Sequence, residues 1–420
     1  MALQTFANGE SGLSVRSKIN ANFTELYAQT GNVVFGSEFV AADNVTDDTA
    51  GIHAAIDAIE AKGGGLIIMP QGICRTTGIN RTAQNGIPWL MTCFSKGSTT
   101  IRKMGSGPDP VFTLNGPGSL SGADWYGGFQ GLSFDGLNAS TSPAALRLHG
   151  VARAITDDLL FLNSFRGCES IGSLILAFNN CSANGNGDGY YTTNSVPLGL
   201  YSNLITWNGG ESRGNAGWGF NLGGGEAYDI NGVDTSGNGT DATGFTGAIY
   251  FRDSVDDESG YATAIIRNAY IEANRSRAIY VENAPGLRLA IHSSKVVGHL
   301  PVETFPPIQV GLAASFTARD SLLLVDTNIA ASRSAIMETL VANLTDTSTV
   351  RYHRNLSGTG VDTRYSVASG ALQVGLDAFG VLGNAPVGKQ TVPATATDLA
   401  TAIARVNGVV DALRTFGFVN

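Results

Sequence analysis

Short apolar segments recur along the middle of this chain, and they constrain its fold more than any other feature. Each has three or four residues and is short enough to be a buried strand. Their separations scatter around twenty to thirty residues, which is the period expected for one turn of a solenoid. The segments are residues 132–134, 159–161, 175–178, 204–207, 230–233, 269–271 and 289–291.

A second repeat follows four stretches of this region: a small polar turn, an Asn, and a new apolar step. Asn and Gly tolerate left-handed backbone conformations, so each turn is expected to bend at this Asn and begin its next strand. About eight rungs from residue 131 to about 334, at ~4.8 Å each, predict a rod about 40 Å long. The four Asn residues are Asn184, Asn215, Asn238 and Asn274.

Residues 46–78 combine a helix start, a helix stop and a strand. The Asp-Asp-Thr run at 47–49 can accept hydrogen bonds from the free amides of a helix start, and apolar spacing continues one helical face through 52–59. Three glycines at 63–65 end that helix, and the apolar run at 66–69 fits a buried strand. A capped helix is therefore expected at the start of the sheet.

This cap segment resembles the N-terminal cap of the pectate-lyase-like right-handed β-helix family, where the same elements cover the open end of the solenoid. The resemblance implies an all-β fold, a right-handed parallel β-helix. The repeat supports the same fold independently. Covering the first rung would protect an otherwise exposed sheet edge.

The first 35 residues are expected to form a short helical head that attaches to another protein. An apolar stripe with spacings of four, four and three runs along one helix, which is marginal in water unless it buries that stripe. The order of residues 12–28 also resembles the N-terminal attachment segment of many bacteriophage tail fibres and tailspikes. The stripe consists of Val15, Ile19, Phe23 and Leu26.

The C-terminus is expected to be an oligomerisation helix. Its apolar positions step by four, three, four and three, which is a heptad seam about two heptads long. An amphipathic helix packed on its own chain is the alternative. Residues 378–388, just before it, resemble an ending common in phage fibre proteins. The seam consists of Leu399, Ile403, Val406, Val410 and Leu413.

Together the resemblances are to a phage tailspike, normally a homotrimer of the virion that acts outside the cell at the host surface. They imply a host surface polysaccharide as ligand and a tail or baseplate protein bound by the head. We divide the chain into a head (1–35), a β-helix cap with irregular first turns (36–129), a β-helix body (130–334), late rungs or a stem (335–390) and the C-terminal helix (391–420).

Charge and composition exclude several other classes of partner. The net charge is −9 with 15% charged residues and no Lys/Arg cluster, so no nucleic-acid footprint is present and a polyhydroxyl partner fits better. The four cysteines form no C-x-x-C pair, which predicts buried free thiols instead of zinc or disulfides. Neither a secretory leader nor an apolar run of ~18 residues is visible, so no membrane insertion is expected.

Carboxylates at related positions of neighbouring rungs are the candidates for catalysis. Glycoside hydrolysis needs one protonated and one ionised carboxylate ~5–9.5 Å apart, and stacking brings residues far apart in sequence to such distances. We expect Asp188 and Glu211 first, then Asp234 and Glu272. Turn capping is the alternative role for each Asp.

Four aromatic residues near these carboxylates are candidates for stacking on sugar rings. They are Trp207, Trp218, Tyr190 and Tyr191, and packing along the solenoid core is the alternative for each.

Lyase chemistry needs a base and a cation that stabilises developing charge, and His149 with Arg147 and Arg153 is the one local set that could supply both. No metal or other cofactor is expected. The EF-hand-like run that begins at Asp234 has Phe245 where the bidentate Glu belongs.

Three hypotheses follow for the function. The first is a tailspike that binds surface polysaccharide and depolymerises it by hydrolysis. The second is a receptor-binding or structural fibre without catalysis, and the third is a polysaccharide lyase. Because this solenoid hosts hydrolases, lyases and inert adhesins, fold alone does not choose among them.

Overall fold

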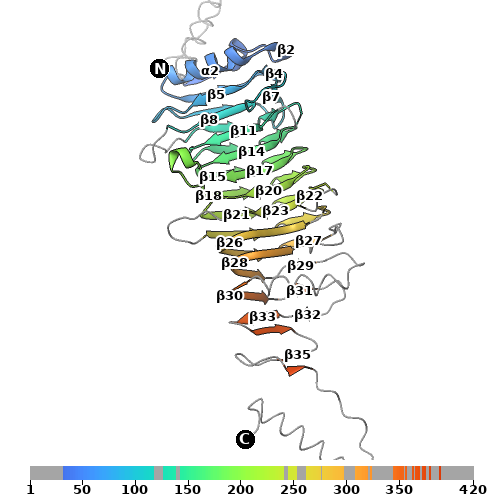
Figure 1. Ribbon diagram of the computed structural model, residues 1–420. Coiled ribbons are helices and arrows are strands. Elements are labelled where there is room, and N and C mark those ends of the chain that lie inside the picture. The colour runs from blue at the N-terminus through green and yellow to red at the C-terminus, as the bar shows by residue number, and fades with distance from the viewer. Residues whose placement is uncertain are drawn as a thin grey trace, which may run out of the picture.

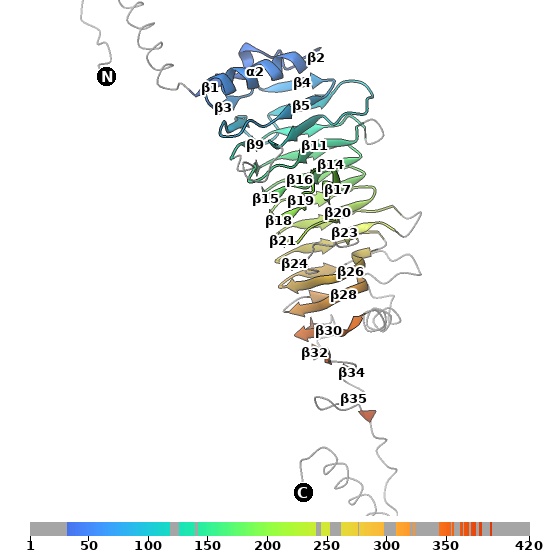
Figure 2. The same cartoon turned by 60° about the vertical axis from the view of Figure 1, so that its left-hand side comes forward.

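The chain coils into a rod of stacked strands. The computed structural model describes residues 32–117, 126–138, 142–240, 245–252, 262–275 and 277–297, and the backbone of further strands between residues 308 and 388. Each turn of the coil supplies one strand to each of three parallel faces, which we name A, B and C in chain order (Figures 1 and 2). The predicted parallel β-helix is therefore confirmed. The predicted helical head and C-terminal helix lie outside the described residues.

Face A begins with the first strand of the described chain. Its strands are β1 (Val33–Phe35), β3 (Gly65–Ile68), β6 (Trp89–Thr92), β9 (Gly128–Gln130), β12 (Ile155–Asp157), β15 (Leu174–Asn179), β18 (Asn203–Asn208), β21 (Ala227–Asn231) and β24 (Ala262–Arg267). β1 already pairs in parallel with β3, so the coil is under way before residue 36.

Face B consists of shorter strands in one separate parallel sheet. They are β2 (Asp43–Asp47), β4 (Gly72–Thr76), β7 (Thr99–Lys103), β10 (Ser133–Asp135), β13 (Leu160–Leu162), β16 (Ser182–Asn184), β19 (Glu211–Arg213), β22 (Asp234–Ser236), β25 (Tyr270–Glu272), β27 (Lys295–Val297) and β29 (Leu322–Leu323).

Face C lies between face B of one turn and face A of the next. Its strands are β5 (Ile79–Thr82), β8 (Phe112–Asn115), β11 (Ala144–His149), β14 (Arg166–Ile171), β17 (Asp188–Thr193), β20 (Trp218–Leu222) and β23 (Gly247–Phe251). The 3₁₀ helices η1 (Gly36–Glu38) and η3 (Val196–Leu198) lie in turns.

Two long strands, β26 (Arg277–His292) and β28 (Ile308–Arg319), each run through faces C and A. Past them, β30 (Leu344–His353) still pairs in parallel with β28. Antiparallel pairs then replace the coil in the described strands: β31 (Asn355–Leu356) with β32 (Asp362–Thr363), β33 (Tyr365–Ala368) with β30 and β34 (Ala371–Val374), and β35 (Ala378–Phe379) with β36 (Val387–Gly388).

Helix α2 (Thr49–Ala61) covers the first turn of the coil, as predicted for this segment (Figure 1). It buries one apolar face, and three glycines with positive φ follow its end at 63–65. The capping hydrogen bonds differ from the expectation. Asp47 accepts from the amide of Thr49 at 3.0 Å, whereas the Asp48 carboxylate accepts from the amides of Ala41 and Ala42 and holds the preceding strand segment.

Apolar and aromatic side chains fill the inside of the coil in columns. Tyr190 and Phe220 stack with ring centroids 5.0 Å apart, and Phe178 and Trp207 stack at 5.7 Å. All four side chains are almost completely buried. Stacked rings of this kind add to the free energy of burial by about 0.5–1.5 kcal/mol per pair.

An amide ladder runs through the corner between faces B and C. The Asn215 amide nitrogen and Nδ2 both donate to Asn238 Oδ1, at 3.1 and 2.8 Å, and Asn238 donates to Asn274 in the same way. In the preceding turn of the coil, the residue that donates to Asn215 Oδ1 is Asn186 instead of Asn184. Three of the four predicted corner Asn residues are thus confirmed, and Asn184 is wrong by two positions.

The left-handed backbone conformation expected of this corner Asn belongs to a different residue. The left-handed residue is the one just before each ladder Asn: Gly185, Gly214, Gly237 and Ala273. The Asn is selected instead because its side chain bridges turns while being buried. Gly189 leaves room for the ladder, since a Cβ there would lie 2.9 Å from Asn215 Nδ2.

The apolar segments used to find the repeat belong to two different faces. Residues 132–134, 159–161 and 269–271 fall on or beside face B strands, whereas the other four segments fall mostly on face A. The true period is read from paired residues, and it varies from 22 positions (Ile155 to Ala177) to 38 positions (Leu90 to Gly128). The A-to-B corner has two residues in every turn from β9 to β27, so the variation among those turns arises at the two corners that border face C, whereas in earlier turns the A-to-B corner is longer, with six residues between β6 and β7.

We expect Asn215→Ala to lower the free energy of unfolding by about 1–3 kcal/mol, because it leaves the Asn186 amide and the Ala183 carbonyl buried without partners. Asn184→Ala is the control, since Asn184 is half-buried and bonds Glu211 on the outer surface. Urea unfolding of both variants measures the difference. If the two variants lost the same free energy of unfolding, a special role for the ladder would be contradicted.

Candidate functional site

The outer surface of face C carries a continuous row of polar and aromatic side chains. Parallel pairing places one residue from each successive strand directly beside the next. At ~4.8 Å per strand, the six steps of this row span about 29 Å. The members of this face C row are Thr113, Arg147, Glu169, Tyr191, Asn221, Tyr250 and Tyr280.

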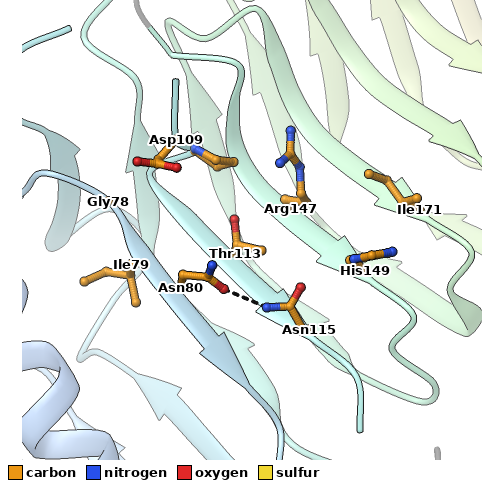
Figure 3. Close-up of a pocket in the computed structure, with 10 residues that line it drawn as sticks. Gly78, Ile79, Asn80, Asp109, Thr113, Asn115, Arg147, His149 and Ile171 are labelled. Atoms are coloured by element: carbon orange, nitrogen blue, oxygen red, sulfur yellow. Dashed lines mark hydrogen bonds between the residues drawn. The ribbon is translucent and has the colours of Figure 1, made fainter. Parts of the chain in front are cut away.

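A hollow of about 430 Å³ lies at the N-terminal end of the face C row. Figure 3 shows Asn80, Thr113 and Asn115 on one side of it, with Arg147 and His149 projecting from the adjacent strand β11. Asn115 Nδ2 donates to Asn80 Oδ1 at 2.7 Å, which fixes both carboxamides. The lining therefore offers amide, hydroxyl, imidazole and guanidinium groups to a ligand.

His149 in this hollow is held by a buried serine. Its Nε2 lies 2.8 Å from Ser195 Oγ. Burial and then the charge of Arg147 lower the pKa of His149 below its ordinary value, so the ring is neutral near pH 7. The structure brings His149 and Arg147 together but places Arg153 apart from them, against the ring of Tyr126.

Glu169 binds two arginines beside the hollow. Arg147 Nε lies 2.5 Å from Glu169 Oε2, and Arg166 pairs with the other carboxylate oxygen. The Glu169 side chain is 2% exposed, whereas Arg147 and Arg166 are 28% and 24% exposed. The carboxylate is thus hidden behind the guanidinium groups that it holds.

Tyr191 lies at the centre of the face C row and is contacted by two arginines. The guanidinium carbons of Arg166 and Arg252 lie 3.4 and 4.2 Å from the Tyr191 ring centroid. Arg252 also donates to the Tyr191 hydroxyl at 2.9 Å and to the Thr192 carbonyl. These contacts hold a half-buried aromatic ring in one orientation at the surface.

Asp188 begins strand β17 on the same face. Its two oxygens accept from the Trp218 amide and from Asn221 Nδ2, each at 2.8 Å, so it ties one turn to the next. Burial raises its pKa above the ordinary 3.8, and these hydrogen bonds and the charges of Arg166 and Arg252 offset part of that increase.

An aromatic cluster ends the row. Tyr250 stacks on Trp218 at 4.9 Å and on Tyr280 at 5.3 Å, and Phe245 meets all three rings edge-on. Trp218 and Tyr250 are buried within the cluster, while Phe245 is 44% exposed. Among the residues expected to stack on sugars, Trp207 and Tyr190 are inside the coil, so their rings are not accessible to a surface ligand.

The other three expected carboxylates lie on face B, away from Asp188. Glu211 and Asp234 are paired neighbours of adjacent strands, and Arg213 forms ion pairs with both, at 3.2 Å to Glu211. Glu272 occupies a different column, paired in register with Ser236. The structure therefore brings Glu211 and Asp234 together, leaves Glu272 in the neighbouring column where its charge still acts on Arg213, and separates all three from Asp188.

Several prominent residues of face C were not singled out from the sequence. They are Glu169, Arg166, Arg252, Tyr250 and Tyr280, which no local motif marks. The alternation of inward and outward side chains would have indicated Glu169, since it stands between the inward residues Cys168 and Ser170. The pairing of strands from different turns, which sequence spacing obscures, is needed for the rest.

Known structures with a similar fold include viral proteins and polysaccharide lyases. ORF18 of Geobacillus virus E2 superposes with a TM-score of 0.55 at 14% identity, over 89% of this chain and 71% of that chain. Tailspike protein 3 of bacteriophage CBA120 (TM-score 0.46, 12% identity, 87% and 76%) and pectate lyase Pel9A (0.44, 14%, 61% and 67%) resemble it more loosely. No protein-family model and no curated protein sequence matches the chain.

Within the described residues, no cluster of three His, Cys, Asp or Glu side chains could hold a metal ion. The helices of this part of the chain include none long and apolar enough to span a membrane. Cys74, Cys168 and Cys181 are free and buried, as predicted, and Cys93 is free and half-buried.

We expect Asp188→Asn to flatten the dependence of stability on pH. The folded chain binds the Asp188 proton more tightly than the unfolded chain does, so wild-type stability falls as the pH rises from 3.8 through the raised pKa. The variant lacks this contribution. Denaturant unfolding at intervals between pH 4 and pH 7 measures both proteins, and parallel curves would refute the assignment.

Proposed function

We propose that this chain binds a bacterial surface polysaccharide, such as capsule, O-antigen or exopolysaccharide, along the outer surface of face C. The observation that carries the proposal is the face C row, about 29 Å long at ~4.8 Å per strand, which ends at the 430 Å³ hollow. A surface of this length fits several sugars in line. A compact small molecule would use only one part of it.

The chemistry of the row supports the same ligand. Sugar hydroxyls both donate and accept hydrogen bonds, and the hollow presents Asn80, Thr113 and Asn115 for such bonds. Guanidinium groups lie over the Tyr191 ring, so its edge offers an ordered surface against which a sugar can pack. Protein groups held in place before binding lose little conformational entropy, which favours affinity.

We further propose that the protein is a tailspike or tail fibre of a phage virion that acts outside the cell. The resemblance of residues 12–28 and 378–388 to phage fibre segments supports this assignment, and the similar fold of a Geobacillus virus protein is consistent with it. The head (1–35) would bind a tail or baseplate protein, and the heptad seam within 391–420 would join three copies.

Depolymerisation by glycoside hydrolysis is part of the proposal, and it requires a polymer that extends from face C across the B-to-C corner, because the favoured carboxylates lie on face B. Glu211 and Asp234 are the favoured pair, because paired residues on adjacent strands lie about 5 Å apart, near the separation in retaining enzymes. Asp188 and Glu272 remain single candidates. Arg213 already forms ion pairs with both Glu211 and Asp234, and this occupation of the two carboxylates supports the alternative of a binding fibre without catalysis.

A lyase is the second catalytic candidate, and one observation favours it. A neutral His149 and the Arg147 guanidinium line the same hollow. A neutral imidazole could remove a proton next to a uronate carboxyl, and the guanidinium would stabilise the charge that develops.

A panel of purified capsule, O-antigen and exopolysaccharides tests binding. We expect at least one polymer to bind, and Tyr191→Ala to weaken that binding roughly tenfold, because the variant removes the ring that holds Arg166 and Arg252 in place at this surface. Tyr126→Ala is the matched control, since Tyr126 is an exposed tyrosine beside Arg153 that does not line the hollow. Failure of every polymer to bind would refute the proposed function. If Tyr191→Ala and the control variant lost the same affinity for the polymer, the assignment to face C would be refuted.

Chain length of the bound polymer after incubation tests catalysis. We expect shortened chains with new reducing ends, and a loss of about 10²–10⁴-fold in rate for Glu211→Gln or Asp234→Asn. Products with unsaturated ends that disappear in His149→Gln would identify a lyase instead. If the polymer bound but its chain length did not change, the alternative of a binding fibre without catalysis would be supported.

A further inference from the structure

The cations of face C are more accessible than the carboxylates around them. Arg147 and Arg166 are partly exposed, whereas Glu169, which pairs with both, is almost fully buried. Asp188 has both oxygens occupied by donors from the next turn, Trp218 and Asn221. A ligand approaching the strands from β11 to β17 therefore meets guanidinium groups before it meets Glu169 or Asp188, while the exposed Asp109 carboxylate lines the other side of the hollow (Figure 3).

Arg252 adds a third guanidinium that has neutral hydrogen-bond partners. It donates to the Tyr191 hydroxyl and the Thr192 carbonyl, and it lies against the Tyr191 ring. Three guanidinium groups (Arg147, Arg166 and Arg252) against two carboxylates (Glu169 and Asp188) leave a charge of +1 around Tyr191, and Asp109 at the other side of the hollow is offset by the nearby Lys103 ammonium group. The whole chain, in contrast, carries −9.

On the basis of the proposed function, we infer that the polysaccharide carries an anionic group and that Arg147, Arg166 and Arg252 select for it. Carboxylate and phosphate share the required chemistry, because the planar fork of a guanidinium matches two oxygens of either group. Both Glu169 and Tyr191 hold these side chains in place before the ligand arrives. A neutral polymer would gain no charge-assisted hydrogen bond here.

The test uses the polymer selected by the panel and two derivatives of it, one with its carboxyl groups reduced to alcohols and one with its phosphates removed. We expect one derivative to bind at least about tenfold more weakly than the parent, the loss of one charge-assisted hydrogen bond. Which derivative fails identifies the anion. A neutral parent, or two derivatives that bind as well as the parent, would overturn the inference while the proposed function stands. A panel without any binding overturns both.

Substitutions of single arginines show which side chains bind the anionic group of the polymer. Arg252→Gln should weaken the parent about tenfold yet leave the affinity of the anion-free derivative unchanged, because the two losses concern one interaction. Arg267→Gln is the matched control, an ion-paired arginine on face A whose loss should alter neither affinity. Thermal unfolding checks that Arg252→Gln is folded, and Arg147→Lys, which keeps the charge but loses the fork, is the second variant. If Arg252→Gln and Arg147→Lys each lost as much affinity for the anion-free derivative as for the parent polymer, selection by these arginines would be refuted.

Discussion

The stacking of each residue on its counterpart in the next turn is the constraint on which the rest of this molecule depends. Parallel pairing keeps these counterparts about one strand spacing apart, ~4.8 Å, along the whole described coil. A buried polar group in one turn must therefore find its partner directly above or below. The Asn186, Asn215, Asn238 and Asn274 ladder meets this requirement, since each side chain satisfies the donors of the turn before it.

The same stacking assembles the outer surface of face C. Thr113 and Tyr280 are far apart in sequence, yet they belong to one row because every strand between them is in register. Ion pairs and ring contacts then fix the side chains of that row. Glu169 orients two guanidinium groups and Tyr191 is contacted by two, so the surface is ordered without a ligand. Order of this kind reduces the entropy lost on binding.

Local patterns predicted local structure well. The helix at 49–61, the glycines that follow it and three of the ladder Asn residues could be read from capping rules and turn chemistry. Face assignment could not, because all three faces bury apolar residues and the period varies between turns. Trp207 and Tyr190 therefore looked equivalent to Tyr191 in sequence, although an odd or even position in the strand decides whether a ring faces the core.

The candidate site shows the same limit more strongly. Asp188 and Glu211 are close in sequence but lie on different faces, since a corner separates their strands. Glu211 and Asp234 did come together, because both begin a face B strand. The contact of Arg252 with Tyr191 could not be predicted from the sequence, because Arg252 follows β23, two turns away from the strand that carries Tyr191.

The unequal corners of the coil have a consequence for how such a protein can diversify. From β9 to β27 the A-to-B corner keeps two residues per turn, whereas both corners that border face C vary in length. Extra residues can therefore be inserted after the ladder Asn in the B-to-C corner, or in the C-to-A corner, without shifting the register of the ladder or the core. Recognition and folding are encoded in separable parts of each turn, so the surface could be rewritten turn by turn while the rod beneath it stays the same.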